Sequence, residues 1–388
     1  MAIVRQAASG AVEKIAEALD EIETLLARLL DTPRGRWWRL IRTAEYRQPE
    51  VVRRLLALAD DAGLRDRKLS VALVRAATSI ADALARDNPR AADLRFQAWK
   101  LASALFREAG RYDDTVYALE FAEEAARNAS DSELALAAVR FSRALLCAEP
   151  DVWKPDEATT LLDRAEEVFA RRDPGRRGGV VTARAFLSFR AADFDSARAC
   201  FEEILAATPE GDRDAYLNAL SNLMFARVEL GQMDDDVRRA IDRLVEENLR
   251  RGRSVQVARA RWLQGKVARF RGNYVDAIAL LRAARSGIAD SDAAIRIGMD
   301  ILESLLLDER HDDAASLALE LSAEAVALDQ REPSRRRSLT AEVFAYARQA
   351  AHRGALTADL VSELSRYVDR IHRQRPTDFI PPMPLEHM

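Results

Sequence analysis

Few residues in this sequence have the type and spacing that metal binding or catalysis requires. Its histidines are His311, His352, His372 and His387. None of them has a second histidine four residues on or a cysteine close by, although a zinc ion needs about four such ligands together. Cys147 and Cys200 also lack paired spacing, so we predict no metal site and two free thiols in a reducing compartment.

Phosphate-binding and catalytic motifs are incomplete as well. Gly265-Lys266 lacks the glycine five residues earlier and the following hydroxyl residue of a phosphate-binding loop. The glycine pair in "RRGGVV" (176–181) is not a dinucleotide fingerprint. Acidic pairs such as Glu123-Glu124 are common among 63 acidic residues, and we interpret them as solvated helix faces. We therefore predict no catalytic residues, no cofactor and no enzymatic activity.

One segment combines basic and aromatic residues. Residues 34–54 hold seven arginines and two glutamates, and the segment is centred on Arg36, Trp37, Trp38, Arg39 and Arg42. Arginine and tryptophan together are typical of contacts with nucleic acid or an anionic membrane. The alternatives are a protein contact, or a structural role in which Trp37 packs inward and the arginines pair with acids. We favour the structural role, because the whole chain has a net charge of -4.

The elements that must position these residues are predicted to be helices. The 388 residues include only 15 Gly and 12 Pro, with Ala, Leu, Arg and Glu dominant, which is a helix-forming composition. No apolar stretch of about 18 residues predicts a membrane span, and the first residues do not resemble a signal peptide. We therefore expect a cytoplasmic protein.

A short phrase recurs along the chain. A small or turn residue is followed two positions later by a bulky residue, and three positions after that usually by a small one. Clear copies lie at 109–122, 191–204, 230–243 and 271–284, with degenerate copies at 65–78, 152–165 and 308–321. The small positions, at intervals close to 40 residues, are Ala72, Thr115, Ala158, Ala197, Asp236, Ala277 and Ala314. A weaker eighth copy lies around Asp359.

Each copy predicts two antiparallel helices. The turn residue lets the chain reverse, and the small residue lets the second helix approach the first closely. One such pair leaves an apolar face exposed, and stacking several pairs buries it.

This pattern resembles the tetratricopeptide repeat. The matching residues in the copy at 109–122 and its preceding helix are Trp99, Phe106, Gly110 and Tyr112; those in the copy at 271–284 are Gly265, Gly272, Tyr274 and Ala277. Pro209 stands where the motif has a terminal proline. The repeats depart from the family in exceeding its usual length of about 34 residues. The resemblance, which extends to bacterial regulatory proteins built from such arrays, implies an all-α, right-handed solenoid of about seven or eight helix pairs.

In arrays of this type the first helix of each pair lines the concave face. The side chains expected there are Lys100, Arg107, Arg140, Arg143, Phe186, Arg190, Asn218, Asn222, Phe225, Arg259, Trp262, Lys266 and Arg269. The set is mostly basic, so it favours an extended peptide with acidic residues or a free carboxyl terminus. The alternative is that several of these arginines are solvated or paired between neighbouring helices.

The two ends of the chain differ from the array. Residues 1–33 contain an apolar seam, Val12, Ile15, Leu19, Ile22, Leu26 and Leu29, which predicts a helix that caps the array or, alternatively, one that forms a dimer. The array spans 34–330, a helix pair over 331–374 closes it, and a proline-rich tail covers 375–388.

The sequence therefore predicts a non-enzymatic adaptor that binds and regulates a protein or peptide in its concave groove. The alternatives are a switch that senses a peptide or small molecule, and a nucleic-acid or membrane contact through residues 34–54, which we favour less. The partner, the pathway and the oligomeric state do not follow from the sequence.

Overall fold

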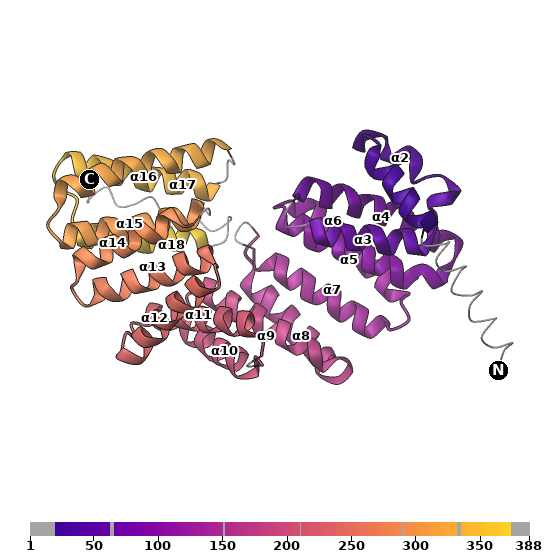
Figure 1. Ribbon diagram of the computed structural model, residues 1–388, viewed down its shortest axis with the longest axis horizontal. Helices are drawn as coiled ribbons and strands as arrows, with labels where there is room; N and C mark the ends of the chain where they lie inside the picture. The colour runs from indigo at the N-terminus through magenta and orange to yellow at the C-terminus, as the bar shows by residue number, and fades with distance from the viewer. Residues whose placement is uncertain are drawn as a thin grey trace. The chain divides into compact units, whose positions relative to one another are not determined.

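Helices account for all the regular structure in the described residues, which are 20–62, 66–149, 152–209, 211–288, 291–331 and 335–373 of a computed structural model (Figure 1). The chain divides into two compact units. Unit 1 lies within residues 1–148 and 156–180, and unit 2 within 149–155 and 181–388. The predicted all-α helical repeat is confirmed, but its single continuous array is divided between the two units.

Unit 1 contains the basic segment and the first helix pairs. Its helices are η1 (Arg34–Arg36), α2 (Trp37–Leu40), η2 (Ala44–Tyr46), α3 (Pro49–Ala62), α4 (Arg67–Asp87), η3 (Pro89–Ala91), α5 (Ala92–Glu108), α6 (Tyr112–Arg127), α7 (Ser132–Cys147), α8 (Pro155–Arg172) and η4 (Pro174–Arg176). The consecutive helices α3 to α7 each pack on the next one.

Unit 2 contains the later pairs. Its helices are α10 (Phe194–Ala207), α11 (Arg213–Glu229), α12 (Asp235–Arg250), α13 (Ser254–Phe270), α14 (Tyr274–Ser286), α15 (Ser291–Leu307), α16 (His311–Arg331), α17 (Arg335–His352) and α18 (Ala358–Arg373), and it includes most of α9 (Arg177–Arg190). The last helix departs from simple stacking, because α18 contacts both α15 and α17.

The predicted turns have the geometry that the repeated phrase requires. Gly110 and Gly272 adopt φ values of +69° and +79°, in the left-handed region that favours glycine. After each of them the backbone closes the helix end: Arg111 N donates to Phe106 O at 2.8 Å, and Asn273 N to Ala268 O at 2.9 Å. Ala192 takes the same conformation, with φ +61°, without being glycine.

The buried small residue after each turn is mostly the predicted one. Thr115, Ala158, Ala197, Ala277 and Ala314 are all buried.

The predicted small position is wrong in two copies. In α12 the buried residue is Val237, while the side chain of Asp236 is 79% exposed, because Asp234 caps the helix and shifts its start. In α4 the buried residue is Ser70 rather than Ala72, because Asp66 caps that helix and Ser70 Oγ donates to Ala59 O at 2.7 Å. Apolar spacing alone did not place these two helix starts.

The helix that precedes the array packs against unit 1. Residues 20–31 are helical, and the seam residues Ile22, Leu26 and Leu29 are buried there. Tyr46 is fully buried, and its hydroxyl donates to Leu25 O at 2.8 Å. These three seam residues are buried within the chain itself, and the cap stays the preferred prediction. The rest of the seam and the tail at 375–388 lie outside the described residues.

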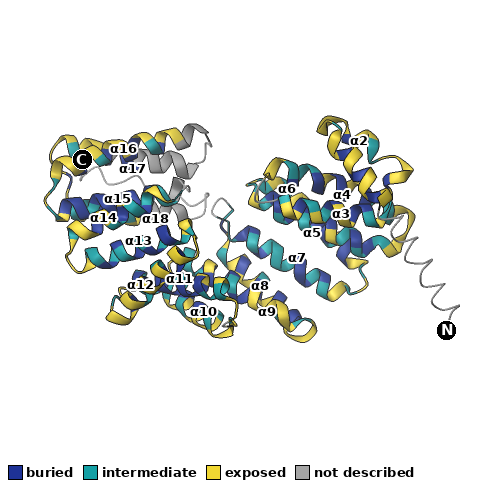
Figure 2. Ribbon diagram, viewed as in Figure 1, coloured by how far each residue is buried: buried dark blue, intermediate teal, exposed yellow. Residues whose placement is uncertain are grey.

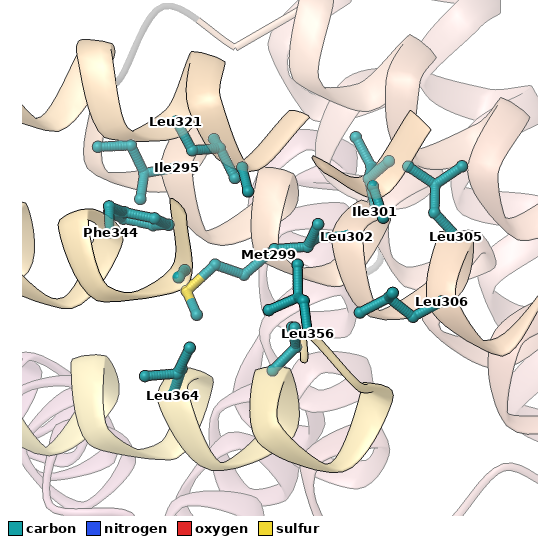
Figure 3. Packing of buried hydrophobic residues seen from close by; sticks show 14 of the residues in the cluster. Ile295, Met299, Ile301, Leu302, Leu305, Leu306, Leu321, Phe344, Leu356 and Leu364 are labelled. Atoms are coloured by element: carbon teal, nitrogen blue, oxygen red, sulfur yellow. The ribbon is translucent and has the colours of Figure 1, made fainter. Parts of the chain in front are cut away.

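The core of unit 2 consists of two hydrophobic clusters, each of which spans several helices. Figure 2 shows buried stripes on the packed faces of its helices. In Figure 3, Leu302 of α15 and Leu321 of α16 pack with Phe344 of α17 and Leu364 of α18. An added Cβ at Gly265 would lie 2.6 Å from Leu281 Cγ, so only glycine allows α13 and α14 to approach this closely. The core thus fixes α13 and α15, which together carry six of the thirteen residues of the candidate site.

Candidate functional site

A pocket of about 180 Å³ lies in unit 2, and we call it the unit-2 pocket. It is formed by α9, α10, α11, α13, α15 and α18. Its lining residues are Phe186, Phe189, Phe201, Asn222, Phe225, Glu229, Arg259, Trp262, Lys266, Arg296, Met299, Asp300 and Ser365. Three successive first helices, α11, α13 and α15, thus contribute to one site, together with the helix that folds back on α15.

Aromatic rings form the apolar part of the pocket. Phe186 and Phe201 meet edge to face with their centroids 5.6 Å apart, and Phe225 meets Trp262 in the same way at 5.3 Å. These geometries are favourable for aromatic pairs. Phe186 is 43% exposed, so one ring remains accessible. The arrangement can accept a bulky apolar side chain.

Arg259 is the cation of the pocket without a partner of opposite charge. Its Nη2 donates a hydrogen bond to Asn222 Oδ1 at 3.3 Å, and its guanidinium lies 5.4 Å from the centroid of the Phe225 ring. It forms no ion pair with the residues that the structure describes. Burial lowers the pKa of Arg259 because the charged form loses hydration. An anion in the pocket would restore that lost stabilisation.

A network of ion pairs includes three other charged residues of the lining, Glu229, Lys266 and Asp300. Asp300, only 7% exposed, accepts from Trp262 Nε1 at 2.7 Å and from Arg269 Nη1 at 2.8 Å. Arg269 Nη1 also donates to Glu303 Oε2 at 2.8 Å. Lys266 Nζ donates to Glu229 Oε1. These ion pairs connect α11, α13 and α15.

Electrostatics in this network favour the ionised forms at its centre. Burial by itself would raise the pKa of Asp300, but Lys266 and Arg269 outweigh it and lower that pKa. Burial would likewise lower the pKa of Lys266, but Asp300 and Glu229 outweigh it and raise that pKa. Glu303 differs, because burial and nearby Asp300 raise its pKa. Asp300 and Lys266 are thus fixed, charged parts of the fold.

The structure divides the predicted groove residues into three sets. Six line the unit-2 pocket: Phe186, Asn222, Phe225, Arg259, Trp262 and Lys266. Three lie in unit 2 outside that lining: Arg190, Asn218 and Arg269. Four belong to unit 1: Lys100, Arg107, Arg140 and Arg143. All thirteen stay predictions as binding residues, and six of them lie around one pocket.

Several of the other seven have partners within the chain. Arg143 Nη2 lies 2.9 Å from Glu123 Oε2. Asn218 Oδ1 accepts from Arg253 Nη2 at 2.7 Å. These are the contacts between neighbouring helices that the alternative interpretation of the basic set expected. Lys100 has a lowered pKa, because it is buried and lies near Arg176.

The sequence analysis missed the acidic half of the site. Glu229 and Asp300 line the unit-2 pocket, as do Phe189 and Phe201. Their positions depend on which helices stack, and apolar periodicity does not reveal that. One signal was present: Asp300 stands in the strongly apolar stretch "IGMDILESLLL", where a buried carboxylate must find a partner.

The basic aromatic segment in unit 1 has a mixed outcome. Trp37 is buried and its Nε1 donates to Thr32 O at 2.8 Å, as the structural interpretation expected. Trp38 is 49% exposed, and the guanidiniums of Arg39 and Arg42 lie 5.2 and 5.3 Å from its ring centroid. Arg36 is exposed. Those three arginines pair with no acid among the described residues.

Among the described residues, no group of three or more His, Cys, Asp or Glu side chains is placed to hold a metal ion. No described helix is both long enough and apolar enough to cross a bilayer.

Comparisons with known proteins place the fold. No family model and no curated protein matches the sequence. Among solved structures, the apo form of RapI is similar with a TM-score of 0.55 and 13% identity, over 92% of this chain and 97% of that one. BtubC (BKLC) from P. vanneervenii gives a TM-score of 0.43 at 21% identity, over 60% of this chain and 88% of that one. The P58(IPK) TPR domain gives 0.20 at 14% identity, over 82% and 98% of the two chains.

The fold argument rests on RapI, which matches this chain along nearly its whole length. The chain itself has the helix pairs, left-handed turns and buried small residues of a helical repeat. The chain is therefore an all-α helical-repeat protein with a tetratricopeptide-like fold.

Proposed function

We propose that the protein is a non-enzymatic adaptor that binds an extended peptide segment of a partner protein in the unit-2 pocket and thereby regulates that partner. The observation that carries this proposal is Arg259. It is a partly buried guanidinium that lines the pocket, and no carboxylate among the described residues pairs with it. A carboxylate of the ligand would supply charge-assisted hydrogen bonds in that place.

The neighbouring groups support a peptide ligand. Asn222 holds Arg259 through its Oδ1, so its amide nitrogen is left to donate to a peptide carbonyl. The rings of Phe186 and Phe225 offer an apolar surface beside these polar groups. A volume of about 180 Å³ is below the roughly 300–1,000 Å³ of drug-sized ligand sites. It suits one large side chain of a longer segment that continues across the helices.

The fold suits such a role. Stacked helix pairs present extended surfaces along their first helices, and binding there needs no chemical step. We place this adaptor in the bacterial cytoplasm, with an acidic segment or a free carboxyl terminus as the feature it recognises.

A ligand-sensing switch is the second candidate, and one observation favours it. Ser365 of α18 lines the same pocket as Arg259 of α13. A ligand that contacts both would bind most tightly when α18 rests on α15, so it would shift the population toward that arrangement. Amide hydrogen exchange tests this: ligand should slow exchange in α18, whereas unchanged exchange there would leave only the adaptor.

The main proposal is tested by selecting displayed peptides of random sequence on the full-length protein. Selected peptides are synthesised, and their affinities are measured by isothermal titration calorimetry. We expect them to combine a carboxylate with a bulky apolar residue. Arg259→Gln should weaken binding at least about tenfold, since a charge-assisted hydrogen bond is worth about 1.5–3 kcal/mol.

The matched control is Arg261→Gln, on the same helix but outside the pocket lining. It removes the same charge and should leave affinity unchanged. Selection of no peptide, or equal loss of affinity in the two variants, would contradict the proposal.

A further inference from the structure

A second pocket, of about 650 Å³, lies in unit 1 far along the sequence from the first, and we call it the unit-1 pocket. Its lining residues are Arg34, Trp37, Trp38, Ile41, Arg67, Lys68, Val71, Ala72, Arg75, Ala76, Ser79, Ala109 and Arg111. Five of these carry a positive charge and none carries a negative one. It shares no residue with the unit-2 pocket.

The inside of the unit-1 pocket is aliphatic. Val71, Ala72 and Ala76 of α4 form one side, and Ala109, just after α5, adds to it. Trp37 also lines the pocket, and the only donor of its side chain, Nε1, already donates to Thr32 O. These walls offer carbon surface to a ligand and almost no hydrogen-bonding groups.

Two cations on the pocket are held in place by shared partners. Arg75 and Arg111 lie 5.6 and 5.3 Å from the centroid of the Phe106 ring. Both also pair with one carboxylate, that of Asp114. One negative charge cannot neutralise two guanidiniums, so an ordered excess of positive charge remains.

The start of α4 adds two more cations. Arg67 and Lys68 are exposed and form no ion pair with any residue in the described part of the chain. They stand in the first turn of a helix of 21 residues, whose amino-terminal end is itself positive. The nearby acid, Asp66, is engaged by Leu69 N at 2.9 Å and by Arg34 at 3.4 Å.

We propose that the unit-1 pocket docks an acidic segment of a partner protein, with an aliphatic side chain against Val71 and Ala72 and flanking carboxylates on Arg67, Lys68 and the Arg75–Arg111 pair. The pocket combines apolar side chains with five charges that are all positive, and this combination suits such a segment. Single-stranded nucleic acid fits less well, because its bases stack on open aromatic faces. Arg39 and Arg42 already lie against the Trp38 ring, and Trp37 is buried.

The test uses the full-length protein and a displayed library of random twelve-residue peptides. Clones that bind wild type are counter-selected on Arg67→Glu/Lys68→Glu. The matched control, Arg86→Glu/Arg90→Glu, makes the same charge change at the opposite end of α4 and in η3 just after it, on exposed residues outside the pocket. Selected peptides are then measured by fluorescence anisotropy with each variant.

We expect the clones lost on Arg67→Glu/Lys68→Glu to carry at least two carboxylates around an aliphatic residue. Their dissociation constants should rise at least about tenfold in that variant and stay within about twofold in the control. Ala72→Trp, which fills the floor without changing the charge, should weaken binding similarly. Urea unfolding of each variant verifies that it is folded.

Three results would overturn the proposal. The first is that the selected clones show no enrichment in acidic residues. The second is that the control variant weakens binding as much as the pocket variant does. In the third, a twelve-nucleotide oligothymidylate binds more tightly than the peptides and loses affinity in the pocket variant, which would assign the surface to nucleic acid. Arg259→Gln should not affect these peptides, so failure here is distinguishable from failure of the unit-2 proposal.

Discussion

Arg107 in unit 1 and Arg269 in unit 2 occupy the same position of their repeats, three residues before the glycine of the turn. Their surroundings differ. Arg107 lies 3.8 Å from the carboxylate of its neighbour Glu108, whereas Arg269 reaches two carboxylates of the following repeat, each at 2.8 Å. Equal positions in a repeat thus acquire different roles, because the next first helix decides which partner is available.

The two pockets extend this comparison. The unit-2 pocket contains cations and acids that largely neutralise each other, and one arginine without an acid. The unit-1 pocket has no acid in its lining at all. In a helical-repeat scaffold, similar basic residues can therefore have two roles. In the unit-2 pocket they hold neighbouring repeats together, and in the unit-1 pocket they form an open charged surface.

The largest effect that would break this comparison is expected at Arg269. Arg269→Ala leaves Asp300 buried without its closest cation, and breaking a buried pair costs about 3 kcal/mol of the free energy of unfolding. Arg107→Ala should cost less than about 1 kcal/mol, because the carboxylate of Glu108 is about half exposed and stays hydrated without its partner. Urea unfolding followed by tryptophan fluorescence measures both. Equal losses would show that position in the repeat, not the neighbouring helix, sets the role.

The cost of Arg269→Ala in unfolding free energy should depend on pH with a definite sign. The pKa of Asp300 is lowered in the folded protein, so its contribution is complete above the unfolded pKa of about 4 and is lost as the pH falls below it. The difference in unfolding free energy between wild type and Arg269→Ala should therefore be full at neutral pH and shrink in acid. A difference that grows in acid would contradict the assigned network.

A smaller effect is expected where the helices of a pair approach each other. Gly265 and Ser103 stand at equal distances before their turn glycines. Gly265→Ala should cost about 1–3 kcal/mol, because its Cβ would overlap the Leu281 side chain. Ser103→Ala loses only the hydrogen bond to Lys100 O and should cost about 1 kcal/mol or less. Thermal unfolding of the two variants, compared with wild type, tests the order of the two costs.

The smallest effect concerns the turns. Gly110→Ala places a Cβ in the left-handed region and should destabilise the protein by about 1 kcal/mol. Ala192, with φ +61°, already bears that strain, so Ala192→Gly should stabilise by up to about 1 kcal/mol. Midpoints of urea unfolding should shift in opposite directions. A shift in the same direction would mean that the two turns are not equivalent.

The sequence predicted the repeat well where local chemistry decides it. Gly110, Gly272 and the buried Thr115 and Ala277 follow from backbone geometry and close helix contact, which involve neighbouring residues only. The misplaced positions in α4 and α12 have a local cause too. Capping by Asp66 and Asp234 moved those helix starts, and apolar spacing alone could not detect the shift.

The sequence predicted about half of the residues that line the candidate site. The cationic and aromatic members came from the first helices, so a position within a repeat was enough to nominate Arg259, Trp262 and Lys266. Asp300 and Glu229 could not be nominated in this way, because each meets its partner across two stacked repeats. Nor did the sequence indicate that α18 would return to α15 and bring Ser365 to the pocket.

What the sequence determined by itself is the class of fold, the turns and the face of each helix that carries charge. These depend on interactions within about one helical turn or one helix pair. The tertiary structure decided which charges neutralise each other and which stay available. Coulomb energy and desolvation depend on the distances between side chains that stacking brings together. Arg269 and Asp300, like Lys266 and Glu229, are more than 30 residues apart in the sequence.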